Sequence, residues 1–126
     1  VPYKSLDKTS IGIEICNWGQ LTQKDGKFYN YVNKVVPADQ VCTLDKPYKG
    51  FKFFHDYTDA QIQAVKELLL LWKEKYNIPL TYNEDIWGIT SRCLKGEKGV
   101  YTHNSCRKDK IDIYPHPKMI EMLKSL

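Results

Sequence analysis

Residues 57–79 read YTDAQIQAVKELLLLWKEKYNIP, and this stretch sets the fold class. Thr58 is followed three positions later by Gln61, which is the capping-box pattern that begins a helix. Asn77 and then Pro79 predict where the helix ends. The residues that recur at helical spacing, and that we expect to face inward, are Ile62, Val65, Leu68, Leu69, Trp72 and Tyr76.

Upstream of this helix, residues 10–16 alternate in character. Three isoleucines at odd positions fall on one face, and the other face is small or apolar except for Glu14 at its centre. Such a segment is typical of a central strand that is covered on both sides. We therefore expect residues 10–16 to lie inside a sheet.

Weaker signals complete the fold. Short strand-like pieces are expected within residues 28–36 and 40–44 and again at residues 100–103, and Pro117 is well placed as the first residue of a terminal helix. Strands that flank a long helix without a regular alternation of the two predict an α/β fold, with helices packed on a single mixed β-sheet. A chain of 126 residues is expected to form one domain.

Charge and composition exclude several classes of protein. The net charge is +4, from 19 basic and 15 acidic side chains, and these charges are scattered, so a nucleic-acid partner is not expected. No apolar run approaches the roughly 18–20 residues of a membrane span. The four cysteines lie far apart without a C-x-x-C pair, which indicates neither a zinc ribbon nor a disulfide framework.

Glu14 is the first candidate for chemistry. A carboxylate inside a covered strand loses its hydration, so we expect it to meet a positive or hydrogen-bonding partner and to act in a cleft, either as a general base or as a carboxylate that supports another site residue. The alternative is that the strand lies at an edge and that Glu14 points to water.

The second candidate is the segment from His103 to Asp112, with eight intervening residues. Imidazole and carboxylate groups are both zinc ligands, and a loop of this length can fold back to bring the two side chains around one ion. A structural hydrogen bond between them is the alternative, and Cys106 is a rival ligand. His55 and His116 are interpreted as surface or capping residues.

Three ordered stretches together resemble the type 2 N-acetylmuramoyl-L-alanine amidases, a family that includes phage endolysins and peptidoglycan-recognition proteins. They are SIGIEI at residues 10–15, YTDAQ at residues 57–61, and TH at residues 102–103 with KID at residues 110–112. Three matches in order are far more specific than any one of them, so the resemblance implies an amidase-like fold.

The resemblance also implies the roles of individual residues. His103 and Asp112 would bind Zn²⁺, which lowers the pKa of bound water and polarises the amide carbonyl. Glu14 would handle the proton of the attacking water, and Lys110 would stabilise the oxyanion. The residues expected to contact substrate are Asn17, Trp18 and Tyr101.

Two departures from the family pattern matter. The usual D-P-G after the last ligand is replaced by Asp112-Ile113-Tyr114. The family's first zinc ligand is a histidine on an earlier strand, whereas the first histidine of this chain is His55. Because catalytic zinc usually has three protein ligands, we expect residues 1–126 to be an amidase domain without its N-terminal part, whose zinc site an upstream segment completes.

The expected function is zinc-dependent hydrolysis of the amide between N-acetylmuramic acid and L-alanine, with the muramyl peptide of peptidoglycan as substrate and the bacterial cell wall as the place of action. Secretion, the periplasm or release by a phage would all bring the chain there. The alternative is a non-catalytic peptidoglycan-binding module on the same fold. A third interpretation, a small interaction domain without a site, requires all three matches to be chance.

Overall fold

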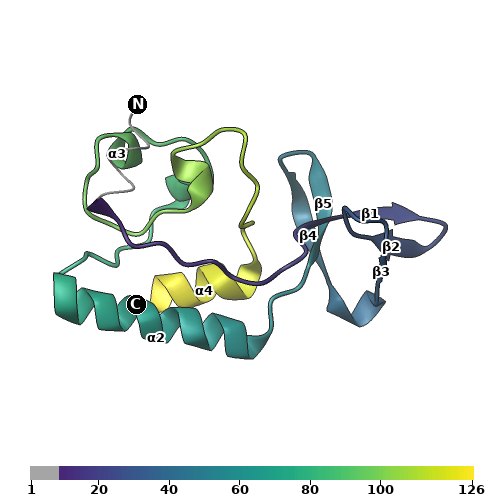
Figure 1. Ribbon diagram of the computed structural model, residues 1–126, viewed down its shortest axis with the longest axis horizontal. Helices are drawn as coiled ribbons and strands as arrows, with labels where there is room; N and C mark the ends of the chain where they lie inside the picture. Colours follow the sequence, from purple (N-terminus) through teal and green to yellow (C-terminus); the bar gives the residue numbers. More distant parts are fainter. Residues whose placement is uncertain (1–8) are drawn as a thin grey trace.

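The computed structural model describes residues 9–126, with a five-stranded sheet at one end of a group of helices (Figure 1). The strand order is β3-β2-β1-β5-β4, and every pairing of neighbours in this sheet is antiparallel. The expected α/β architecture with a single sheet and packed helices is confirmed. The sheet is antiparallel and not mixed as predicted, because consecutive strands are joined by short connections instead of long crossovers. The strands are β1 (Gln20–Lys24), β2 (Lys27–Tyr29), β3 (Val35–Val36), β4 (Val41–Tyr48) and β5 (Phe51–His55).

The helices occupy the other end of the molecule. The long α2 and the terminal α4 lie side by side, and a segment of short helical turns lies above them in Figure 1. The α-helices are α2 (Asp59–Tyr76), α3 (Ser91–Leu94) and α4 (Pro117–Ser125), and the 3₁₀ turns are η1 (Ala38–Gln40), η2 (Glu84–Trp87) and η3 (His103–Ser105).

Both ends of α2 follow the sequence signals. The Thr58 hydroxyl accepts a hydrogen bond from the Gln61 backbone N–H at 3.0 Å, and the Gln61 side chain accepts one from the Thr58 N–H at 3.0 Å. Asn77 closes the helix in the left-handed region, with φ 55°. These contacts are local in sequence, so the predicted start and end of α2 are confirmed.

The buried face of α2 is narrower than predicted. Ile62, Val65 and Leu69 are buried, as expected, but Leu68 is 37% exposed and Tyr76 is 55% exposed. The prediction for these two residues was wrong because α4 covers α2 along one side, and a single neighbouring helix covers only a narrow stripe.

Residues 10–16 form no strand, so that prediction was wrong. The alternation itself is present: Ile13 and Ile15 pack against the core, while Glu14 is exposed. A period of two requires only an extended backbone with one covered side, and it does not supply a hydrogen-bonded neighbour. Residues 100–103 likewise lead irregularly into η3 instead of forming a strand.

A stack of aromatic rings joins the sheet to the loop before α4. Tyr114 is 1% exposed and lies between two rings, with centroids 4.3 Å from Phe54 and 5.0 Å from Tyr57. Its hydroxyl donates to the His55 carbonyl at 2.6 Å. Because these contacts bury a large apolar area, they fix the position of the chain just after Asp112.

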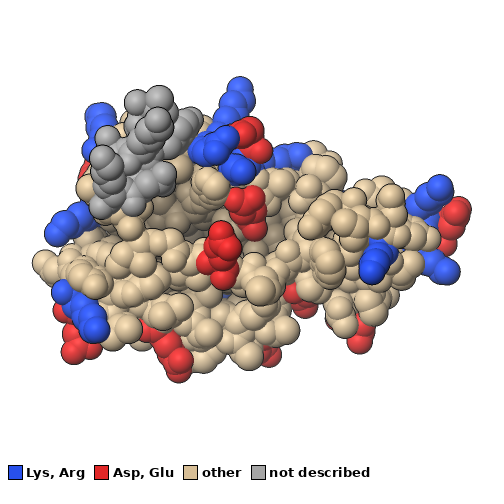
Figure 2. Space-filling view, in the orientation of Figure 1, with Lys and Arg blue, Asp and Glu red and all other residues tan. Residues whose placement is uncertain are grey.

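No helix formed by residues 9–126 combines the length and apolarity that a bilayer span needs. Figure 2 shows basic and acidic side chains interspersed over the face it presents, with acidic groups near the middle of that face.

Candidate functional site

The structure brings His103 and Asp112 together. The Nδ1 atom of His103 contacts the Oδ2 atom of Asp112 from the two ends of one loop, residues 103–112. The two side chains are 43% and 56% exposed, so both are reachable from solvent. An imidazole nitrogen and a carboxylate oxygen therefore meet at an accessible point of the surface.

Asn104 closes the base of this loop. Its side chain is fully buried, and its amide donates to the Ile113 carbonyl at 2.7 Å. Since Asn104 follows His103 and Ile113 follows Asp112, this one bond holds the neighbours of both predicted ligands.

The start of the loop is fastened to η2. The Ser105 hydroxyl donates to the Ile86 carbonyl at 2.6 Å, and the Thr102 hydroxyl donates to the same carbonyl. The Thr102 backbone N–H also donates to the Ser105 hydroxyl at 3.1 Å. The role of Thr102, open from the sequence, is thus to anchor the turn that carries His103.

Lys110 and Glu14 occupy different settings. Lys110 lies in the same loop, two residues before Asp112, with a half-buried side chain and with its backbone carbonyl bound by Lys49. Glu14 is exposed on the extended segment before β1. Glu14 was expected to be buried and paired, but it is exposed to water, so burial does not force a partner on its carboxylate.

The polar atoms of Asn17 have structural partners. Its amide donates to the carbonyls of His55 at 2.9 Å and Asp56 at 3.1 Å, and its oxygen accepts from the Gly19 N–H at 2.7 Å. Asn17 therefore fastens the segment before β1 to the end of β5.

Trp18 and Tyr101 present their rings differently. The Trp18 side chain is 42% exposed, and its ring lies 5.9 Å from that of Tyr31. Tyr101 is half-buried, donates its hydroxyl to the Glu97 carbonyl at 2.8 Å and lies under the Arg92 guanidinium. Burial, opposed by Arg92, raises the pKa of Tyr101, so its hydroxyl remains a donor at neutral pH.

Comparison with protein families identifies the chain. The family model for N-acetylmuramoyl-L-alanine amidase matches residues 3–117 of the 126 residues. The chain belongs to this amidase family. The family's substrate is peptidoglycan, and its matched region contains the whole loop from His103 to Asp112. Searches among curated proteins and among solved structures gave no match.

The predicted metal pair of this amidase fits zinc by its chemistry. Nitrogen from imidazole and oxygen from carboxylate are both common zinc ligands, and here the two donor atoms are already adjacent and accessible. Within residues 9–126, the group of three donor side chains close enough to share one ion contains neither of them. The described residues thus place two side chains that could serve as ligands at this point.

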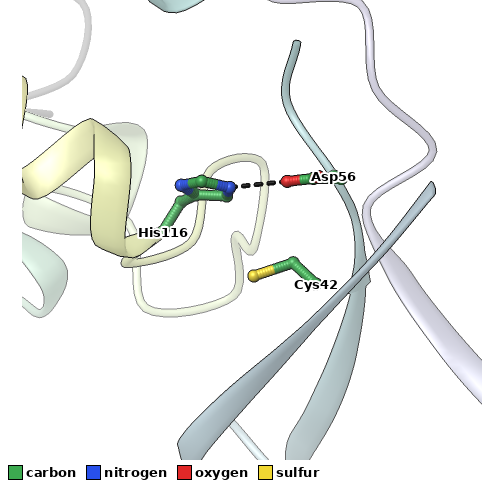
Figure 3. Close-up of side chains that lie close together, drawn as sticks. All are labelled: Cys42, Asp56 and His116. Atoms are coloured by element: carbon green, nitrogen blue, oxygen red, sulfur yellow. Dashed lines mark hydrogen bonds and ion pairs between the residues drawn. The ribbon is translucent and has the colours of Figure 1, made fainter. Parts of the chain in front are cut away.

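That three-donor group consists of Cys42, Asp56 and His116, whose donor atoms lie within 4.8 Å of one another (Figure 3). His116 precedes α4, and its Nδ1 accepts from the Lys118 backbone N–H at 3.0 Å. A backbone N–H can only donate, so the ring proton must lie on Nε2. Nε2 lies 2.6 Å from Asp56 Oδ1 and donates to it.

The proton on Nε2 decides the nature of this group. A metal ion would need the lone pair of Nε2, but the helix cap already requires the lone pair to be on Nδ1. Burial and then the nearby Asp56 raise the pKa of the Cys42 thiol, so the thiol beside this hydrogen bond holds its proton more tightly than a free cysteine does. We interpret the group as a structural connection between α4 and the end of β5.

Proposed function

We propose that this chain supplies two metal ligands and the proton-handling groups of a zinc-dependent amidase that cleaves the bond between N-acetylmuramic acid and L-alanine in peptidoglycan. The observation that carries the proposal is the contact between His103 Nδ1 and Asp112 Oδ2 inside the region that matches the amidase family. The family match supports peptidoglycan as the substrate, and the contact between His103 and Asp112 supports a metal site.

His103 and Asp112 would hold the ion. When bound, zinc polarises the carbonyl of the scissile amide and makes water a stronger nucleophile at neutral pH. A third protein ligand is usual in catalytic zinc sites. We propose that it comes from a segment that precedes the described residues.

The remaining groups act on charge and protons. In this proposal the Lys110 ammonium lies beside the carbonyl oxygen of the substrate and offsets the negative charge that develops there. Glu14, whose carboxylate is accessible to water, takes the proton of the attacking water and returns it to the leaving L-alanine nitrogen.

Substrate would lie against the surface around these groups. The exposed indole of Trp18 offers a flat apolar face for a sugar ring or a peptide side chain. The polar atoms of Asn17 and Tyr101 already have protein partners, so their proposed role is to support the surface that substrate contacts and not to bind substrate directly.

A peptidoglycan-binding module without catalysis is the second candidate. The observation that favours it is the grouping of donors, because the three-donor group of the described residues excludes His103 and Asp112. A receptor needs only a surface that binds peptidoglycan, whereas an enzyme also needs a complete metal site.

One experiment separates the two functions. The full-length protein is purified, its zinc content is measured by atomic absorption, and it is incubated with purified peptidoglycan. An amidase holds close to one zinc per chain and releases peptides with a new N-terminal L-alanine, and a chelator stops the release. Binding to peptidoglycan without zinc and without release would establish the receptor and refute the enzyme.

A further inference from the structure

Lys49 occupies an unusual backbone position. It is the first of two residues in the turn between β4 and β5, with φ 50°, and Gly50 follows with φ 86°. Positive φ at both central residues is typical of a tight hairpin turn, where asparagine, aspartate and glycine are preferred at the first position. A lysine backbone is strained there, and such strain persists where the surrounding structure holds the residue in place, often at functional sites.

The Lys49 side chain reaches three oxygen atoms of the 103–112 loop. Its Nζ lies 3.4 Å from Asn104 Oδ1 and 3.2 Å from the Lys108 carbonyl, and it also contacts the Lys110 carbonyl. A lysine ammonium has three hydrogen-bond donors and no acceptor, so its donors match these three acceptors in number. The bonds are charge-assisted, which makes them stronger than bonds between neutral groups.

These three acceptors lie at the base and in the second half of the loop. Asn104 is the residue whose amide joins the two ends of the loop at Ile113, and the Lys108 and Lys110 carbonyls lie in the second half of the loop. The loop itself is irregular beyond η3. Lys49 therefore connects the base and the second half of the loop to the β4–β5 hairpin.

The same hairpin is also held by Tyr48, the residue before Lys49. The Tyr48 hydroxyl donates to the Trp87 carbonyl, and the Tyr48 and Trp87 rings meet edge to face at 6.4 Å. Burial raises the pKa of Tyr48 to about 12, so the hydroxyl keeps its proton at neutral pH. The turn at Lys49 is thereby fixed against η2, to which the start of the 103–112 loop is also fastened.

We propose that Lys49 is a positioning residue for the metal site, which holds the 103–112 loop so that His103 and Asp112 face each other. This inference rests on the proposed function for its consequence in metal binding, but its effect on the loop stands on the contacts alone. Lys49 touches neither substrate nor metal in this proposal.

The test uses the full-length protein and three variants, with Lys49→Arg added as a rescue variant. Lys49→Met keeps the apolar stem and removes the donors, while Lys49→Gly removes the side chain and suits the left-handed backbone. Lys46→Met, at an exposed position of β4 in the same hairpin, is the matched control. Zinc affinity is measured by competition with a chromophoric chelator, and hydrogen exchange is followed at the amides of residues 106–110, which include the hydrogen-bonded N–H groups of Arg107 and Lys110.

We expect both Lys49 variants to bind zinc at least about 10-fold more weakly, as for other groups that orient a ligand, and to exchange faster in the loop. Lys46→Met should match the wild type in both measurements. Because glycine relieves the turn, the melting temperature of Lys49→Gly should not fall, which separates loop positioning from general stability. Lys49→Arg, which retains the charge and donors, should restore most of the affinity.

The outcomes are distinguishable. Unchanged loop exchange in both Lys49 variants would overturn the inference, whatever the zinc affinity. If the wild type binds no zinc, the proposed function fails, but faster loop exchange in the Lys49 variants would still establish the positioning role.

Discussion

The amide of Asn104 donates to the carbonyl of Ile113 at 2.7 Å from a fully buried position. This one bond spans the loop whose ends carry His103 and Asp112. Because the Asn104 amide is removed from water, loss of this hydrogen bond would leave a buried polar group without a partner and lower the stability of the fold. The geometry of the candidate metal pair thus depends on Asn104, which is not itself a proposed metal ligand.

Asn104→Ala should lower the free energy of unfolding by about 1–3 kcal/mol, since the Ile113 carbonyl is left without its donor. Urea denaturation measures the change. Asn83→Ala, at an exposed site where the amide donates to the Thr81 carbonyl, is the control and should cost less than about 0.5 kcal/mol. Equal costs for the two variants would show that the Asn104 bond is not needed.

The direction of the hydrogen bond between His116 and Asp56 predicts how substitutions of these two residues change stability. Because Nε2 donates to Asp56 Oδ1, an amide oxygen can replace the carboxylate oxygen, and Asp56→Asn should be tolerated at a cost of about 1 kcal/mol. His116→Ala removes both this bond and the cap of α4, and should cost about 2–4 kcal/mol.

Nitrogen-15 NMR of the His116 ring reports directly on the tautomer, and a proton on Nδ1 would contradict the assignment. Titration with Co²⁺ adds an independent check. An intense sulfur-to-cobalt absorption that disappears in Cys42→Ala would prove that the group of Cys42, Asp56 and His116 binds metal.

The parts of the fold that the sequence predicted correctly depend on neighbours along the chain. The capping box at Thr58 and Gln61 and the left-handed Asn77 are decided within a few residues, as is Pro117 at the start of α4. Residues 10–16 were misjudged because a strand also requires a partner, which a period of two does not reveal.

The candidate site shows the same limit. The segment from His103 to Asp112 could be recognised from residue types and order, and the structure places the two side chains in contact. Lys49 could not be recognised, since it lies 61 positions from Lys110 in sequence. A lysine before a glycine in a hairpin turn is the signal that was available, and it gives no indication of the loop it reaches.

The metal pair can be tested at Asp112. Loss of a group that only orients a ligand costs roughly 10–100-fold in metal affinity, so Asp112→Ala should weaken zinc binding by more than this. Asp109→Ala is the matched control, because Asp109 is exposed in the same loop and pairs with Arg107. A zinc affinity equal to that of the wild type in Asp112→Ala would remove Asp112 from the ligand set.

Lys110 should matter for turnover and not for metal. Removal of one group that stabilises an oxyanion costs about 10²–10³ in kcat, so Lys110→Ala should lose that much hydrolysis while its zinc content stays unchanged. Lys108→Ala is the control, because its exposed side chain belongs to the same loop and only its carbonyl is used by Lys49. Normal turnover in Lys110→Ala would exclude Lys110 from the reaction.

Cys93 contributes to the pH dependence of stability in the alkaline range. Burial, and then the nearby Cys106, raise its pKa from 9.0 to about 12. The folded state therefore holds the thiol proton more tightly than the unfolded state, so its contribution to stability is full below pH 9 and is lost as the pH rises towards 12.

Iodoacetamide at pH 8 should modify exposed Cys16 quickly and buried Cys93 slowly, as measured by peptide mass spectrometry. Urea midpoints between pH 8 and 11 should fall less steeply in Cys93→Ala than in the wild type, and parallel curves for the two proteins would show that the Cys93 proton is not linked to folding.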